Sequence, residues 1–291
     1  MRMASMLSNK PILKLMLLIG GLGLILLIVS GAVHFVSSQM MQYEKKEKTM
    51  RVLMQVKQTM DNEIKQMNRV YLRVASDPNV RDYLYAQDPS PVSQKPAAEL
   101  VMKSLNRYKA ANPSILDVYM YAKSNHAIVS TQTVDTPEQF FSTRLYTSMK
   151  YSTWHQLIKS YQNKNYLHIG QTSKDSFKGT GLALFQSLPL TDPTGPDATI
   201  VIVFKSAPLQ SILDTVDPAL QGTVMITDKY DEVLLSSQVR KAPAPEVLDG
   251  MTNDNGVLYM DENGTKVALF YMKSSDPELT YMAFIPEDLL S

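Results

Sequence analysis

The chain contains no cysteine among its 291 residues. This absence excludes disulfide frameworks, thiolate metal sites and cysteine nucleophiles. An exported protein without disulfides has to be stabilised by its hydrophobic core alone, which suits a bacterial envelope protein better than a secreted eukaryotic one. The formal net charge is only +1, with 20% charged residues, and nothing in it indicates a nucleic-acid-binding surface.

Signatures of catalysis are missing as well. The four histidines are scattered along the chain, and no pair of them has the spacing that binds zinc from one helix face. No Gly-x-Ser-x-Gly elbow occurs. The short Gly179-Thr180-Gly181 stretch lacks the third glycine and the following helix of a phosphate-binding loop. We therefore expect no catalytic residue, no metal site and no cofactor in this chain.

One long apolar run lies near the start of the chain, and no second run follows it. It extends from Leu15 to Val33 without a charge, and Ser30 is its only polar residue. Such a run is long enough to cross the ~30 Å hydrocarbon core of a bilayer as a helix. We therefore expect residues 1–37 to form a cytoplasmic tail and a transmembrane helix that carries one large body. The alternative is a cleaved signal peptide, because Ser30 and Ala32 are spaced like the small residues of a cleavage site.

The residues that flank the apolar run indicate its orientation. The short N-terminal flank carries Arg2, Lys10 and Lys14 and no acidic residue. An excess of Lys and Arg favours retention of a short flank in the cytoplasm. The body of the protein is therefore expected outside the cytoplasm, as a single-pass protein of the cell membrane.

A long helix without Gly or Pro is predicted from residue 40 to about residue 76. Its apolar residues recur at alternating steps of three and four, which is the repeat of a coiled coil or of a helix lying along a partner. These residues are Met50, Leu53, Met60, Ile64, Met67, Tyr71 and Val74, with Lys57 as a polar break. Asp77-Pro78 ends the helix, because proline disfavours helical geometry in the preceding residue.

Two interpretations of this stalk (residues 38–78) remain open. It could form a parallel dimer through a seam of Met50, Leu53, Met60 and Ile64, which would let it transmit motion to the bilayer. It could instead pack on its own body. Both can hold at once, with the first half a stalk and the second half docked.

The body divides into two units, residues 79–205 and 206–291. The first has a helix from Pro96 to Tyr108, followed by short β-like runs between turn residues. Its strands are expected at 115–122, 126–131, 165–171, 181–189 and 198–205, with a covering segment at 136–161. The second has a helix at 209–216 and strands at 223–227, 232–236, 256–260, 266–272 and 279–285. This order predicts an α+β fold with two lobes built on antiparallel sheets.

At this level of pattern the chain resembles a bacterial double Cache sensor domain, which has PAS-like lobes. The closest likeness is to the extracytoplasmic sensors of Gram-positive transmembrane histidine kinases and membrane-bound AraC-type regulators. The likeness covers nearly the whole chain. It rests on the stretches Met60–Ile64, Leu72–Val80, Asn112–Tyr121, Val224–Asp228 and Tyr281–Pro286.

The chain departs from the family pattern in two respects. In such proteins a second membrane helix follows the sensor, whereas here the sequence stops at residues 286–291, where a proline and two acids resemble a helix start. We therefore expect a fragment or a truncated reading frame, whose output module is not included. Family members that bind amino acids share a Tyr, Arg, Trp, Tyr and Asp motif. The spacing of Arg144, Tyr146 and Trp154 does not match it, so amino-acid specificity is not carried over.

A binding pocket is the most credible functional site. Small-ligand sites are mostly apolar concavities with a few fixed polar groups, and arginine is well shaped to hold a carboxylate. Tyr119 and Tyr121 share one face of a strand because side chains alternate. The candidate ligand-binding residues are Tyr119, Tyr121, Arg144, Tyr146, Trp154, Phe185 and Gln186. The alternative is that these aromatic residues belong to an ordinary core or lobe interface.

The sequence thus predicts the input domain of a bacterial signal-transducing receptor. Such a domain would bind a small molecule, an organic anion or a sugar, in the first lobe and pass a conformational signal to the membrane, as a parallel homodimer. The alternative is a membrane-anchored envelope protein that binds another protein and has no small ligand. The regular spacing of apolar residues in the stalk favours the receptor interpretation, because a helix that only tethers the body does not need this spacing.

Overall fold

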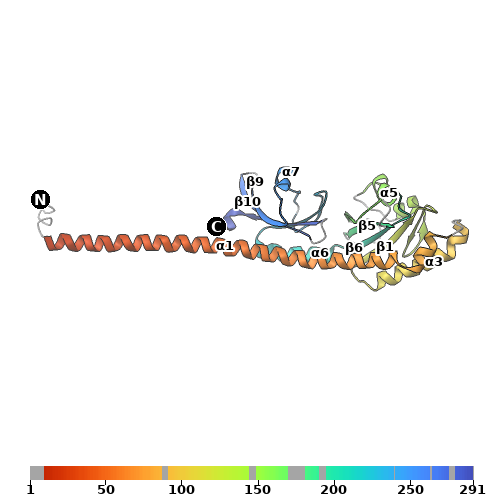
Figure 1. The fold of residues 1–291 in the computed structure, drawn as a ribbon, viewed down its shortest axis with the longest axis horizontal. Coiled ribbons are helices and arrows are strands. Elements are labelled where there is room, and N and C mark those ends of the chain that lie inside the picture. Colours follow the sequence, from red (N-terminus) through yellow and green to blue (C-terminus); the bar gives the residue numbers. More distant parts are fainter. Residues whose placement is uncertain are drawn as a thin grey trace.

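The protein is represented by a computed structural model that describes residues 10–86, 91–143, 149–169, 181–189, 195–238, 240–262, 264–274 and 279–290. Its architecture is one long helix, α1 (Lys10–Ala75), with two antiparallel sheets arranged along it (Figure 1). The predicted α+β fold with a long helix and two lobes is confirmed.

The first lobe lies at the end of α1 that is remote from the N-terminus (Figure 1). Its six-stranded sheet has the order β3-β2-β1-β6-β5-β4. The strands are β1 (Ile115–Ala122), β2 (Ala127–Ser130), β3 (Val134–Asp135), β4 (Asn165–Ile169), β5 (Gly181–Leu188) and β6 (Ala198–Lys205). The helices are α2 (Pro78–Leu84), α3 (Pro91–Ala110), α4 (Pro137–Thr143) and α5 (Tyr151–Lys159).

The second lobe is built on a five-stranded sheet of order β8-β7-β11-β10-β9. Its elements are α6 (Ala207–Leu220), β7 (Thr223–Asp228), β8 (Val233–Ser236), α7 (Pro245–Asp249), β9 (Asn255–Glu262), β10 (Thr265–Lys273), β11 (Leu279–Pro286) and a 3₁₀ turn (Glu287–Leu289). If the short β3 is left out, the two sheets have the same strand order, in which β2-β1-β6-β5-β4 corresponds to β8-β7-β11-β10-β9. In each lobe the first strand pairs with the second and the last.

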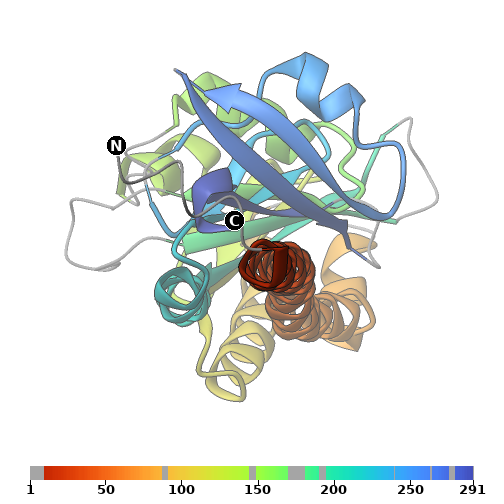
Figure 2. The same cartoon turned by 90° about the vertical axis from the view of Figure 1, so that its left-hand side faces the viewer.

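Three helices cover one side of the two sheets. The end-on view shows α1, α3 and α6 together on this side, with α4, α5 and α7 on the opposite side (Figure 2). The buried apolar side chains of α1, from Leu53 to Val74, belong to one hydrophobic core. This core continues through both lobes. The helix α1 therefore contacts strands of both sheets.

The repeat of the stalk serves this intramolecular packing. Leu53, Met60 and Ile64 are 0%, 1% and 2% exposed against the chain's own core, and Met50 is partly buried there. A side chain that is already enclosed by its own lobe cannot also face a partner helix. The expected dimer seam is therefore occupied by the body of the same chain. The docked part begins earlier than the second half of the stalk, because Leu53 already belongs to the core.

The N-terminal part of α1 extends beyond both lobes (Figure 1). Its large apolar side chains between Ile19 and Val33 are exposed, and Leu27 reaches 74%. The predicted membrane span starts at Leu15, and the side chains of residues 10–18 and 25 lie outside the described residues. Within the part that is described, no helix is both long and apolar enough to cross a membrane.

Helix α3 differs from the prediction at its start. It begins at Pro91 and includes Pro96, where the sequence indicated a loop and a later start. Proline lacks one backbone donor, but its fixed φ angle is compatible with a helix. The helix therefore continues through Pro96 at the loss of one backbone hydrogen bond.

Candidate functional site

An aromatic cluster fills the space between the sheet of the first lobe and its covering helices. Trp154 of α5 donates a hydrogen bond of 3.1 Å from Nε1 to the hydroxyl of Tyr119 on β1. Phe140 of α4 packs against both, with ring centroids 4.6 Å from Tyr119 and 6.0 Å from Trp154. Tyr119, Phe140, Trp154 and Phe185 are all 0% exposed. The cover is thus fastened to the sheet by large aromatic side chains and one buried hydrogen bond.

The sequence places these side chains together through two periodicities. Tyr119 and Tyr121 alternate along β1 and point to the same face of the sheet. Trp154 and Ile158 are four residues apart in α5, so they share the face of that helix that is buried. The short helix therefore presents one apolar stripe to the sheet.

The structure brings together four of the seven predicted ligand-binding residues. Tyr119, Tyr121, Trp154 and Phe185 belong to one cluster. Gln186 follows Phe185 in β5 and therefore points to the opposite face, toward the core that contains α1. Arg144 and Tyr146 lie outside the described residues. Whether this set binds a ligand stays a prediction.

Polar and titratable side chains form a rim beside the aromatic cluster. The hydroxyl of Tyr121 lies 3.0 Å from Nδ1 of His126, and the hydroxyl of Tyr151 donates to Glu138 Oε1 at 2.5 Å. The ring of His155 stacks on Tyr151 with centroids 5.0 Å apart. Nε2 of His155 is buried and has no hydrogen-bond partner among the described residues. This rim offers hydrogen-bonding groups on a largely apolar wall, which is the usual composition of a small-ligand site.

The protonation states of the rim are set by burial and by neighbouring charges. Burial, followed by the charge of Lys159, lowers the pKa of His155 and outweighs the opposing effect of Glu138. The hydrogen bond from Tyr151 holds the pKa of Glu138 below its usual range. Burial and the adjacent Glu138 raise the pKa of Tyr151 to about 12. At neutral pH the rim therefore holds a neutral His155, a neutral phenol and an ionised carboxylate.

Sequence reasoning missed most of this rim. His126 follows the β1–β2 turn in a left-handed conformation with φ 56°, and His155 lies on the covering helix. No local spacing connects the two histidines, because the fold brings them to the same region from separate elements. The only available signal was that the covering segment carries a histidine next to the single tryptophan.

A recess of about 560 Å³ opens near His126, at the edge of the sheet formed by β2 and β3. Residues of α2, α3 and the start of α4 also line it. The recess is larger than the gaps of a close-packed core and falls within the ~300–1,000 Å³ typical of ligand pockets. Open volume in the first lobe is therefore available next to the rim.

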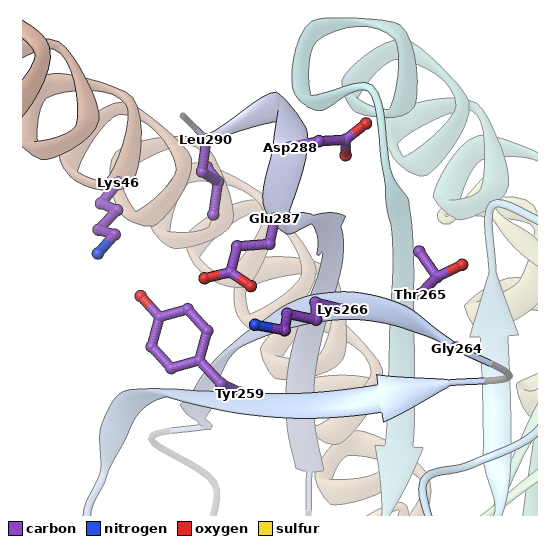
Figure 3. A pocket seen from close by; sticks show the side chains of 8 residues that line it. All are labelled: Lys46, Tyr259, Gly264, Thr265, Lys266, Glu287, Asp288 and Leu290. Atoms are coloured by element: carbon purple, nitrogen blue, oxygen red, sulfur yellow. The ribbon is translucent and has the colours of Figure 1, made fainter.

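A second hollow, of about 520 Å³, lies in the second lobe between α1, the β9–β10 hairpin and the 3₁₀ turn (Figure 3). Lys46, Lys266 and Glu287 point into it, with Tyr259 on its wall. Tyr259 is 54% exposed and Lys266 is also exposed. A ligand in this hollow would remain largely solvated, so the first lobe offers the better enclosed site.

The described residues provide groups for binding rather than for metal chemistry. Among them, no group of three His, Asp or Glu side chains is placed to hold a metal ion. The rim supplies donors and acceptors, and the aromatic cluster supplies apolar surface. This arrangement can orient a small polar molecule.

Solved structures with a similar fold include sensory domains with bound ligands. No protein-family model matches the chain, and no curated protein is significantly similar in sequence. The ligand-binding domain of the Campylobacter jejuni chemoreceptor Tlp3, solved with 4-methylisoleucine, superposes with a TM-score of 0.54 at 11% identity, covering 86% of this chain and 94% of that one. The ligand-binding domain of Mlp24 with asparagine gives 0.52 at 12% identity, with coverages of 87% and 96%. The extracellular domain of the histidine kinase vpHK1S-Z8, described as putative, gives 0.50 at 10% identity, with coverages of 87% and 95%. The chain thus shares the two-lobed fold of these sensory domains.

Proposed function

We propose that this chain is the extracytoplasmic ligand-sensing input domain of a membrane-bound signal-transduction receptor and has no catalytic role of its own. The single observation that carries this proposal is the fold. It matches sensory domains of chemoreceptors and of a histidine kinase over 86–87% of the chain and 94–96% of theirs. The type of output module remains an expectation from sequence, with a histidine kinase or an AraC-type regulator as candidates.

The ligand site we propose lies between the sheet of the first lobe and its cover, at the polar rim beside the packed aromatic cluster. The aromatic wall around Trp154 and the unpartnered Nε2 of His155 support it, because a buried polar atom without a partner is costly unless a ligand or water satisfies it. The sequence favours an organic anion or a sugar. Amino acids join these classes as candidates, because two of the structural neighbours bind amino acids or close analogues.

The signal would travel along α1. This helix contacts the first lobe through Tyr71, whose hydroxyl donates to the Ser187 carbonyl at 2.7 Å, and the second lobe through Asp61. Its exposed apolar part, from Ile19 to Val33, extends beyond both lobes and supports our proposal that it is anchored in a membrane. Dimer contacts would use this part of the helix rather than the buried face.

The alternative is a membrane-anchored envelope protein that binds another protein and has no small ligand. The titratable rim favours the sensor, because a surface that only binds a protein does not need a buried nitrogen without a partner, such as Nε2 of His155. Binding of a small molecule distinguishes the two functions directly.

The test is thermal unfolding of the full chain in detergent with a panel of L-amino acids, organic acids and sugars. A true ligand at 100 times its Kd should stabilise the protein by about 2.7 kcal/mol. We expect Trp154→Ala, His155→Ala and Arg144→Ala to abolish the shift, and Gln156→Ala, on the exposed side of α5, to leave it intact. A shift that survives the first three variants would move the site elsewhere, and no shift with any compound would favour the protein-binding alternative.

A further inference from the structure

The recess at the β2–β3 edge is built around three buried or half-buried polar side chains. Nδ2 of Asn125 donates to the hydroxyl of Tyr83 and to Oε1 of Gln94, both at 2.6 Å. Tyr83 is 1% exposed and Gln94 is 4% exposed. These three residues come from α2, α3 and the β1–β2 turn, so the triad fixes three separate elements around one hollow.

One polar atom of this triad has no partner. Oδ1 of Asn125 is buried and accepts no hydrogen bond from the described residues. Rotating the amide by 180° would not help, because the NH₂ group would then be the unsatisfied end. Asn125 is a lining residue of the recess, so a donor bound there could satisfy this acceptor.

The remaining lining indicates the chemistry of that donor. Amides and hydroxyls dominate its polar part, contributed by Gln132, Thr133, Thr136 and Gln139. Ala98, Met102, Ala127 and Val134 supply apolar surface. The formally charged lining residues are Lys95, Glu99 and Asp135, which sum to a single negative charge. Neutral amides and hydroxyls on an apolar floor match a neutral ligand with several hydroxyl groups, since no concentrated charge is present to hold an ion.

We propose that this recess is a second ligand-binding site of the first lobe, which takes a neutral polyhydroxylated molecule of the mono- or disaccharide class and directs one hydroxyl to Oδ1 of Asn125. The site is separate from the space around Trp154, since it is formed by α2, α3 and the strand edge. His126 of the rim also lines the recess, so the two sites adjoin, and the variants below distinguish them.

The test is calorimetric titration of the full chain in detergent with glucose and maltose. We expect saturable binding of at least one of them. Ala127→Phe, which fills the recess, should abolish it, and Asn125→Leu, which removes the open acceptor, should weaken it about tenfold. The matched control is Lys103→Ala, at an exposed position of α3 that does not line the recess, which should leave sugar binding unchanged.

A second measurement needs no variant and so does not depend on how a variant folds. Saturation-transfer NMR of the wild-type chain with glucose, glucuronate and glucosamine compares one neutral sugar with an anionic and a cationic analogue. Transfer to glucose above both charged analogues is the expected result. Equal or stronger transfer to a charged analogue, absence of binding to both neutral sugars, or binding lost in Trp154→Ala but kept in Ala127→Phe would each overturn the proposal.

Discussion

The hydroxyl of Tyr281, on the last strand of the second lobe, donates a 2.6 Å hydrogen bond to the carboxylate of Asp61 on the long helix. Ser274 donates to the same oxygen at 2.7 Å, and Lys57 donates to the other oxygen at 2.9 Å. Asp61 is only 5% exposed. A buried charge that is fully hydrogen-bonded holds its neighbours in one arrangement, so this contact fixes the register of α1 on the second lobe.

The first prediction concerns the loss of this carboxylate. Asp61→Ala leaves two hydroxyls and an ammonium group without their partner, and we expect it to lower the free energy of unfolding by about 3 kcal/mol. Urea denaturation of the full chain measures this. Lys65→Ala, at an exposed position one turn further along α1, is the matched control and should change stability by less than about 0.5 kcal/mol. Equal effects of the two variants would show that the contact is incidental.

The second prediction isolates one hydrogen bond. Tyr281→Phe keeps the ring and removes only the hydroxyl that donates to the charged Asp61, so we expect a loss of about 1.5–3 kcal/mol. In a double-mutant cycle with Asp61→Asn the two effects should not add, because both changes remove the same contact. Additive effects would mean that the two groups do not interact in solution.

A third prediction follows from two acidic groups on or next to α1. Burial would raise the pKa of Asp61, but the hydrogen bonds from Tyr281, Ser274 and Lys57 outweigh it and hold this pKa below its ordinary 3.8. The pKa of Asp77 is likewise lowered, because hydrogen bonds from Tyr108 and other groups outweigh its burial.

The unfolded chain therefore takes up protons first as the pH falls. The stability that these carboxylates contribute is fully present above pH 3.8 and is lost as the pH falls from there toward their folded-state pKa values. Equilibrium unfolding between pH 5 and pH 2.5 should show this loss, with a shallower slope for Asp61→Asn. An unchanged slope in that variant would contradict the assignment.

The fourth prediction concerns His155 in the rim of the first lobe. Its pKa is lowered by burial and by Lys159, with a smaller contribution from His126, against the opposing charge of Glu138. The unfolded chain again takes up the proton first, this time as the pH falls through the ordinary histidine value of 6.5. Stability should therefore decrease between pH 7.5 and pH 5.5. His155→Gln, which stays neutral, should make this dependence weaker, and a dependence that it leaves untouched would place the titration on another group.

The sequence predicted most strands of the body and the periodic face of the stalk, because both follow from local spacing. It did not predict the short β3 and α7 or the start of α3 at Pro91. It could not show what that face packs against. The same spacing is typical of a coiled coil and of a helix that packs on its own lobe. In the structure Leu53, Met60 and Ile64 pack on their own lobe. Lys57 was interpreted as a break in a seam, whereas in the structure it is the ion-pair partner of Asp61.

In the candidate site, too, local spacing predicted some contacts, whereas contacts between distant segments could not be predicted. Alternation in β1 placed Tyr119 and Tyr121 on one face, and the lone tryptophan marked the cover, so part of the aromatic cluster could be predicted. The same alternation separates Gln186 from Phe185, which the choice of a contiguous pair overlooked. The contact between Asn125, Tyr83 and Gln94 depends on residues up to 42 positions apart and has no local signature.

The central claim is that a ligand held in the first lobe acts through α1 on the second lobe. Hydrogen exchange of the full chain in detergent, with and without a compound identified by thermal unfolding, tests it most directly. The account predicts greater protection in α5 (Tyr151–Lys159) together with a changed exchange rate in α1 around Asp61 and in β11 around Tyr281. Protection confined to the first lobe, with identical exchange at Asp61 and Tyr281 in both states, would contradict it.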